Sequence, residues 1–427
     1  PAAISMTLSD IVQGLLFFTY FYPLFMAYLW IFGGLYYRFH WEKHDGESWE
    51  NPNPLQFYPN VTILLPCHNE GDLAIETIGF LLEQNYPNFD VIAINDGSTD
   101  NTGEVLDVLA EKHDRLRVIH LATNQGKAMA LNTAALMTDS EYLVCIDGDA
   151  LLDKHATHWL MSHFVKSPRV GAVTGNPRIR NRTSLLGKIQ VGEFSCIIGM
   201  IKRAQRIYGR VFTVSGVVVA FRKAALQRVG YWSADMITED IDVSWRLQLN
   251  HWDVRYEPNA LCWILMPETL RGLWRQRTRW AQGGAETYMR YIGSMLSWKK
   301  RRMWPVAIEY IVSVFWSYTL FCIFILWLLG KIIVLPDYLF IKTLLPGWTG
   351  VIIGGTCLLQ FAVSLLIDSR YEKGITRYYY WMVWYPLAYW VLNVLTTVFG
   401  APKAIFKKKG KRATWTSPDR GLQSLDN

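Results

Sequence analysis

Charged side chains are scarce in this 427-residue chain, at 19% of all residues, whereas hydrophobic residues reach 51%. That balance is too apolar for an ordinary soluble enzyme and too polar for a bundle of membrane helices alone. It predicts one soluble domain joined to membrane segments. Nucleic-acid-binding motifs, internal repeats and low-complexity tracts are also missing, so we expect no nucleic-acid partner.

Cysteine is equally sparse, with six residues and no C-x-x-C pair. Such scattered cysteines exclude the disulfide framework of a small secreted protein and the paired ligands of a structural zinc site. They predict reduced, packed thiols in a protein that faces the cytosol. The six positions are Cys67, Cys145, Cys196, Cys262, Cys322 and Cys357.

Long apolar stretches are present at both ends of the chain. The first, Ile11 to Tyr37, is uncharged and long enough to cross a bilayer core of ~30 Å. Arg38, His40 and Lys43 follow it, so the positive-inside rule places that end in the cytoplasm. The others are Val306–Val334, Trp348–Ile367 and Tyr378–Phe399.

The net charge of +7 is concentrated near the C-terminus, because the tail 402–427 holds seven Lys or Arg and two acidic residues. A basic run beside an apolar segment predicts contact with anionic lipid headgroups. If all three C-terminal stretches cross the membrane, however, this tail ends outside, against the positive-inside rule. Either one stretch is re-entrant or the rule fails here.

Between the apolar stretches, strand and helix patterns alternate. Continuous apolar strands separated by helices predict an α/β fold with a mostly parallel sheet, and ligands bind such sheets at the carboxyl ends of the strands. Expected strands are 61–66, 91–95, 117–121, 142–146 and 211–221, and expected helices are 74–84, 103–113, 127–137 and 240–250. The Trp- and Arg-rich stretch 270–298 predicts helices lying in the membrane interface, although an ordinary amphipathic surface helix has the same pattern.

Acidic motifs follow two of these strands. Asp96-Gly97-Ser98 could bind a base or ribose, and is equally compatible with a simple turn. Asp147-Gly148-Asp149 places two carboxylates directly after a buried strand, which suits a divalent cation such as Mg²⁺ or Mn²⁺ beside a diphosphate. Lys127, at the start of a helix, could hold phosphate charge, although a solvated lysine is as compatible because the full phosphate-loop pattern is missing.

Two further motifs lie on predicted helices. Thr238-Glu239-Asp240 begins a helix, where Asp240 could act as a general base; a favourable helix-dipole partner is the alternative. Gln276, Arg279 and Trp280 share one helical face by their i, i+3, i+4 spacing. Arg279 can bind a diphosphate and Trp280 can stack on a sugar ring, whereas an Arg/Trp pair at a membrane interface is the alternative.

The ordered set of motifs resembles the processive family-2 glycosyltransferases, which include the cellulose, chitin and hyaluronan synthases. It is most similar to the bacterial enzymes of this family that make poly-β-1,6-N-acetylglucosamine. The resemblance covers nearly the whole chain. The stretches that carry it are Val144–Ala150, Val173–Arg180, Met236–Asp242 and Arg279–Gly284.

The resemblance implies a GT-A domain between membrane helices that polymerises N-acetylglucosamine from UDP-GlcNAc and exports the chain as biofilm polysaccharide. It implies an inverting mechanism, a growing polysaccharide acceptor, contact with membrane lipids, and a small membrane partner subunit with cyclic di-GMP regulation. The implied catalytic residues are Asp240 and Glu239. The implied binding residues are Asp96, Asp147, Lys127, Gln276 and Arg279 for the donor, Trp280, Ser215 and Gly216 for the acceptor, and Asp147 and Asp149 for the metal.

We therefore expect an N-terminal transmembrane helix (1–40), a linker (41–60), a cytoplasmic GT-A domain (61–268), interfacial helices (269–304), C-terminal transmembrane helices (305–400) and a basic tail (401–427). The protein would reside in the bacterial inner membrane as a multi-pass enzyme. Alternatives are a hyaluronan, chitin or cellulose type synthase, a non-processive lipid-linked glycosyltransferase, and an inactive transporter. The Gln276–Trp280 motif argues against the second, and the intact acidic motifs argue against the third.

Overall fold

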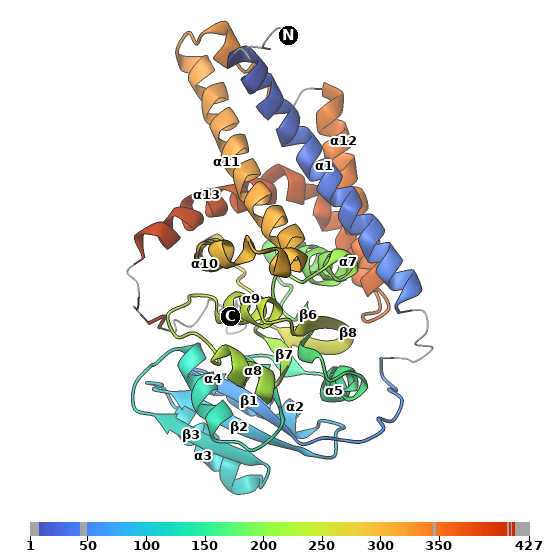
Figure 1. Cartoon of the computed structure of the whole chain (residues 1–427), viewed down its shortest axis with the longest axis vertical. Helices are drawn as coiled ribbons and strands as arrows, with labels where there is room; N and C mark the ends of the chain where they lie inside the picture. The colour runs from blue at the N-terminus through green and yellow to red at the C-terminus, as the bar shows by residue number, and fades with distance from the viewer. Residues whose placement is uncertain (1–7, 43–48, 345–346, 408–409, 411, 415–427) are drawn as a thin grey trace.

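The computed structural model describes residues 8–42, 49–344, 347–407, 410 and 412–414. Figure 1 shows a sheet domain at one end, a layer of helices lying across its top, and long helices that extend away from that layer. Several residues of the predicted basic clusters, namely Lys43, Lys408, Lys409, Lys411 and Arg420, lie outside the described ranges.

The domain is built on an eight-stranded mixed sheet with the order β3-β2-β1-β4-β7-β6-β8-β5. The first four strands of that order are parallel, β7 is antiparallel to both of its neighbours, and β6 and β8 are parallel. The strands are β1 (Val61–Cys67), β2 (Phe89–Asp96), β3 (Leu116–Leu121), β4 (Tyr142–Ile146), β5 (Leu151–Leu152), β6 (Val170–Ile179), β7 (Val218–Arg222) and β8 (Asp253–Ile264).

The central strands β1 and β4 are mostly apolar because both faces of the sheet are covered. On β1, Ile63 and Leu65 pack into one hydrophobic cluster, while Leu64 between them packs into a second cluster on the opposite face. This alternation is the two-residue period of a strand, and helices cover each face. The covering helices are α2 (Leu73–Leu82), α3 (Thr102–Lys112), α4 (Lys127–Leu136), α5 (Ala156–Lys166), α8 (Lys223–Val229) and α9 (Glu239–Leu249).

Among the described residues, three helices are long and apolar enough to cross a membrane: α1 (Leu8–His40), α11 (Trp304–Ile332, preceded by η2, Trp298–Met303) and α12 (Gly347–Asp368). Their outer faces expose large apolar side chains such as Phe21 and Phe32, as lipid-facing helices do. The fourth apolar stretch is divided differently. It forms η4 (Ile375–Trp384), η5 (Tyr385–Tyr389) and α13 (Trp390–Phe406), and α13 lies across the bases of the long helices (Figure 1).

This arrangement removes the conflict between the basic tail and the positive-inside rule. Helix α11 leads away from the sheet domain, α12 returns to it, and α13 then lies across α10 (Leu270–Met295). If the three long helices cross a membrane, Lys403, Lys407 and Arg412 lie on the same side of it as the sheet domain. The structure favours the re-entrant or interfacial alternative for the fourth stretch.

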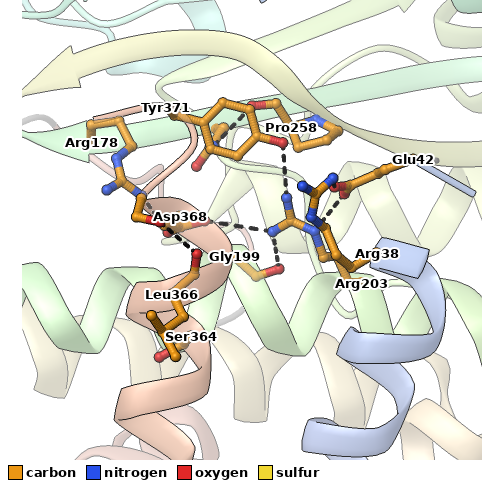
Figure 2. A network of polar contacts seen from close by, with 12 residues as sticks. Arg38, Glu42, Arg178, Gly199, Arg203, Pro258, Ser364, Leu366, Asp368 and Tyr371 are labelled. Atoms are coloured by element: carbon orange, nitrogen blue, oxygen red, sulfur yellow. Dashed lines mark hydrogen bonds and ion pairs between the residues drawn. The ribbon is translucent and has the colours of Figure 1, made fainter. Parts of the chain in front are cut away.

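A buried network of charges joins the long helices to the sheet (Figure 2). Arg203 is fully buried on α7 (Lys202–Tyr208), which continues α6 (Leu185–Phe194) through the π-helical turn η1 (Ser195–Ile201). Its Nε lies 2.6 Å from Oε1 of Glu42, just beyond α1, and its Nη1 lies 3.7 Å from Oδ1 of Asp368, at the end of α12. Asp368 also pairs with Arg178 on β6. We call these four residues the ionic junction.

Substituting Asp368 tests this junction, because Asp368→Ala leaves Arg178 and Arg203 buried with fewer counter-charges. We expect the free energy of unfolding to fall by about 3 kcal/mol, the lower end of the range for breaking a buried pair. Equilibrium unfolding in detergent, followed by tryptophan fluorescence, measures it. The control is Arg180→Ala, which removes an exposed ion pair with Glu76 and should change stability by less than about 1 kcal/mol. Equal losses in the two variants would contradict the prediction.

Candidate active site

Four motifs that are far apart in the sequence meet at the carboxyl edge of the sheet. Strand β2 ends at Asp96 and β4 ends just before Asp147, so both side chains emerge at the same edge. Helix α4 begins there with Lys127, and α9 begins there with Glu239. The edge is therefore lined with acids and one central lysine.

Asp96 is fully buried and holds the loop that leads into α4. Its two carboxylate oxygens accept hydrogen bonds from the backbone N–H groups of Gln125 and Gly126, at 2.7 and 2.8 Å. The approach is close enough to require glycine at Gly97, which has φ of +59° and where a Cβ would lie 2.5 Å from the backbone nitrogen of Asn124. The sequence pattern pointed to a base or ribose contact for Asp96, and that role stays a prediction.

Lys127 is the centre of the site. Its ammonium pairs with Asp147, lies 3.4 Å from Oε1 of Glu239 and donates a 3.1 Å hydrogen bond to the carbonyl of Gly216. Burial alone would lower the pKa of Lys127, but the carboxylates of Asp147 and Glu239 outweigh it and raise that pKa, so the side chain stays charged. Lys127 thus contacts Asp147, predicted for the donor and the metal, Glu239, predicted for catalysis, and Gly216, predicted for the acceptor.

Asp240 lies beside this cluster in the first turn of α9. A Cβ placed on Gly216 would be 3.4 Å from Oδ2 of Asp240, so the Ser215–Gly216 segment borders this carboxylate. Loss of hydration, followed by the negative charge of Glu239, raises the pKa of Asp240 to about 6, while Lys127 and Arg279 oppose the rise. A carboxyl group with this pKa can hold or release a proton near neutral pH, as a general base must.

The two predicted metal ligands supply hard carboxylate oxygens at this edge, which fits a divalent cation that is also bound by phosphate oxygens. Within the described part of the chain, no group of three or more His, Cys, Asp or Glu side chains is arranged as a complete metal site. The charge of Asp147 is instead balanced by Lys127. Any cation here would need ligands from the donor as well as from Asp147 and Asp149.

Helix α10 carries the basic-aromatic motif over the site. The side-chain oxygen of Gln276 is buried with no hydrogen-bond partner among the described residues, which leaves an acceptor free for a ligand. Arg279 is exposed, and Trp280 is partly buried against the main core. Gly283 packs directly on the side chain of Thr238, so α10 touches the motif that contains Asp240.

Arg277, which anchors this motif, was not among the functional residues predicted from the sequence. Arg277 is buried and pairs with Glu193 at 2.6 Å, and its guanidinium lies 4.2 Å from the ring centroid of Trp280. The hydroxyl of Tyr389 donates to the same carboxylate, at 2.9 Å. Only the position of Arg277 inside the motif could have suggested a role, because Glu193 and Tyr389 lie far away in the chain.

The described part of the tail also reaches the site. The backbone N–H of Ala413 donates to the carbonyl of Ala234 at 2.9 Å, and Arg412 donates to the side chain of Gln125. Lys407 forms a 2.8 Å ion pair with Glu286 on α10. The sequence predicted lipid contacts for this basic run, and its position beside the Asp96 loop was not foreseen.

The sequence of the chain is similar to those of known proteins. Residues 59–283 match the family model described as "Glycosyltransferase like family 2". The chain is 43% identical over 409 residues to a poly-β-1,6-N-acetyl-D-glucosamine synthase of Staphylococcus epidermidis, covering 95% of this chain and 98% of that protein. It is 41% identical over 408 residues to the synthase of the same name from Staphylococcus aureus (strain COL), with the same two coverages.

A solved structure shares the fold. It is the mannosyltransferase PcManGT from Pyrobaculum calidifontis in complex with GDP-Man and Mn²⁺, with a TM-score of 0.62, 19% sequence identity, and coverage of 94% of this chain and all of that one. The predicted fold class, a GT-A type α/β domain with a mostly parallel sheet and apolar helices, is confirmed.

Gly283 offers a test of how α10 is held on the site. A Cβ at this position would overlap the side chain of Thr238, so we expect Gly283→Ala to lower the free energy of unfolding by about 1–3 kcal/mol. The matched control is Gly293→Ala on the same helix, where a Cβ meets nothing within 4 Å. Because alanine favours helices, Gly293→Ala should stabilise by about 0.5–1 kcal/mol. Equal stability changes in chemical unfolding would contradict the packing of Gly283 on Thr238.

Proposed function

The chain belongs to glycosyltransferase family 2, and from this we propose that it polymerises N-acetylglucosamine from UDP-GlcNAc into a β-1,6-linked polysaccharide at the bacterial inner membrane. The observation that carries the proposal is the meeting of Asp147, Glu239 and Gly216 around Lys127, with Asp240 beside them. The names of relatives 41–43% identical over almost their whole length support the sugar and the linkage.

In the proposed reaction, Asp240 accepts the proton of an acceptor hydroxyl. The acceptor oxygen forms a bond to the anomeric carbon of the donor while the bond to the diphosphate breaks, and UDP leaves with the electron pair. A single displacement inverts the anomeric centre, so an α-linked donor gives a β-linked product. Glu239 supports Asp240 by raising its pKa, which makes the carboxylate a stronger base.

The remaining residues bind substrates. Lys127, Arg279 and Gln276 would hold the donor diphosphate and sugar, and Asp96 would hold the nucleoside end through the loop it anchors. Asp147 and Asp149 would hold Mg²⁺ or Mn²⁺, which supplies positive charge to the leaving diphosphate. Trp280, positioned by Arg277, would stack on the acceptor sugar next to Ser215 and Gly216.

The membrane part fits synthesis coupled to export. Helices α1, α11 and α12 would form a multi-pass unit, with the sheet domain (61–268) in the cytoplasm where UDP-sugars are made. The interfacial region (269–304) and α13 would lie between them. A small membrane partner subunit would pack on the exposed apolar faces of the three helices. Regulation by cyclic di-GMP is proposed on the family resemblance alone.

Incorporation of labelled UDP-GlcNAc tests the proposal. Membrane vesicles that contain the chain and its proposed small partner subunit would receive the donor with Mg²⁺, and the product would be sized. We expect high-mass product from the wild type and none from Asp240→Asn, which should still bind UDP-GlcNAc. Incorporation of another UDP-sugar without UDP-GlcNAc binding would favour a cellulose type synthase. Normal polymer from Asp240→Asn would contradict the base assignment.

The pH dependence of transfer follows from the raised pKa of Asp240. The base works only when deprotonated, so kcat/KM should fall below pH about 6, approaching tenfold per pH unit, and level off above it. Glu239→Gln removes the neighbouring negative charge, so the midpoint of this profile should move to lower pH. A midpoint that does not move in Glu239→Gln would contradict electrostatic support of Asp240 by Glu239.

A further inference from the structure

One buried cation near the site has no part in the function proposed above. Lys202 begins α7, and only 4% of its surface is exposed. Its Nζ donates hydrogen bonds to Oγ of Ser215 at 2.8 Å and to Oγ1 of Thr174 at 3.4 Å. Among the described residues Lys202 forms no ion pair, unlike Lys127, whose charge is balanced by two carboxylates.

Such a lysine is unfavourable for stability, because a buried ammonium without an adjacent carboxylate loses its hydration. Burial lowers the pKa of Lys202 to about 7, and the charge of Asp240 opposes this shift. A leucine or methionine would fill the same space without the loss of hydration. The polar contacts of Lys202, rather than its volume, therefore explain its presence.

Those contacts fix the Ser215–Gly216 segment. The backbone N–H of Ser215 donates to Thr174 Oγ1 at 2.8 Å, and the Ser215 carbonyl accepts from the N–H of Val218 at 3.1 Å. The carbonyl of Gly216 accepts from Lys127. Two lysines thus hold this short segment from two sides, with Asp240 beside it.

The direction of the hydrogen bond from Lys202 matters. In the structure Lys202 Nζ donates to Ser215 Oγ, so the Ser215 hydroxyl accepts on that side and its own proton is directed elsewhere. Among the described residues, no hydrogen bond from that hydroxyl to an acceptor is found, and Asp240 lies beside the same segment.

We propose that Lys202 is a positioning residue for the acceptor sugar: it turns the Ser215 hydroxyl so that this hydroxyl donates to an oxygen of the saccharide terminus beside Asp240. This inference rests on the proposed function. Its ligand is the hydroxyl-bearing, non-reducing end of an N-acetylglucosamine oligosaccharide. Lys202 itself does not touch the reacting atoms.

The ionic junction explains how Lys202 is kept in place. The next residue, Arg203, is fixed to Glu42 and Asp368 and donates to the carbonyl of Gly199 at 2.7 Å (Figure 2). On β6, Thr174 and Arg178 are four residues apart and so lie on the same face of the strand. The junction therefore fixes both the helix start that carries Lys202 and the strand that carries its second partner.

The test compares two rates in the full chain in membrane vesicles: transfer to an added β-1,6-linked N-acetylglucosamine oligosaccharide, and hydrolysis of UDP-GlcNAc without acceptor. Lys202→Met keeps an unbranched side chain as far as the ε position and removes the ammonium with its donors. We expect its transfer kcat/KM for the oligosaccharide to fall about 10- to 100-fold, as for loss of a charged hydrogen bond, while hydrolysis stays within about twofold. Lys188→Met, a lysine on α6 that lies over Trp381, should change neither rate.

Ser215→Ala provides the second arm. If Lys202 acts through Ser215, the double variant should be no worse than either single variant. Multiplied losses in the double variant, or equal loss of transfer and hydrolysis in Lys202→Met, would overturn the inference. Wild-type chain that neither binds nor incorporates UDP-GlcNAc would contradict the proposed function itself. Normal acceptor transfer by Lys202→Met in active vesicles would overturn only the role of Lys202.

Discussion

The ionic junction is the constraint on which the rest of the structure depends. Arg178 and Arg203 have no access to water at the place where α1 and α12 meet the sheet, so each must stay within reach of Asp368 or Glu42. Separation of the apolar helices from the sheet domain would leave these charges buried without partners. The ionic junction therefore fixes the position of the apolar helices relative to the sheet. This lets one site combine residues from the sheet with residues from the helices beside it.

A second electrostatic pattern organises the site itself. Three carboxylates from two motifs lie close together, and their mutual repulsion would oppose folding if they were unpaired. Lys127 removes most of this repulsion for Asp147 and Glu239, whereas Asp240 stays less compensated and has the raised pKa. Asp240 thus holds a proton more tightly than an ordinary carboxyl group does, which matches the proton transfer proposed for it above.

Local patterns in the sequence were enough for much of the fold. Strands β1 to β4 are short apolar runs, and the acids that follow them are brought together because parallel strands end at one edge. Strands β6 and β8 were not predicted, since Pro177 and Pro258 interrupt them and their pairing joins distant segments. The expected strand 211–221 is shorter, and its first half is the loop that carries Ser215. The fourth apolar stretch has the composition of a membrane span, and only the packing of α13 against α10 distinguishes it from a membrane-crossing helix.

The site, like the fold, could be predicted only in part from the sequence. The motif residues could be listed from the sequence, although their roles stay predictions. Their supports could not be listed, because Arg277 depends on Glu193, 84 residues away, and Lys202 depends on Thr174 and Ser215. The role of such a lysine or glutamate can be assigned only when the folded structure shows which side chain lies beside it.

The pairing of Lys127 with Asp147 has a consequence for the order in which ligands bind. A divalent cation that takes Asp147 must displace the ammonium from it, and a diphosphate that arrives with the cation offers the displaced ammonium a new anion. Either ligand alone would leave one charge unmatched. Cation and nucleotide sugar would therefore bind with positive cooperativity. Without nucleotide sugar, the affinity of the enzyme for the cation would be low.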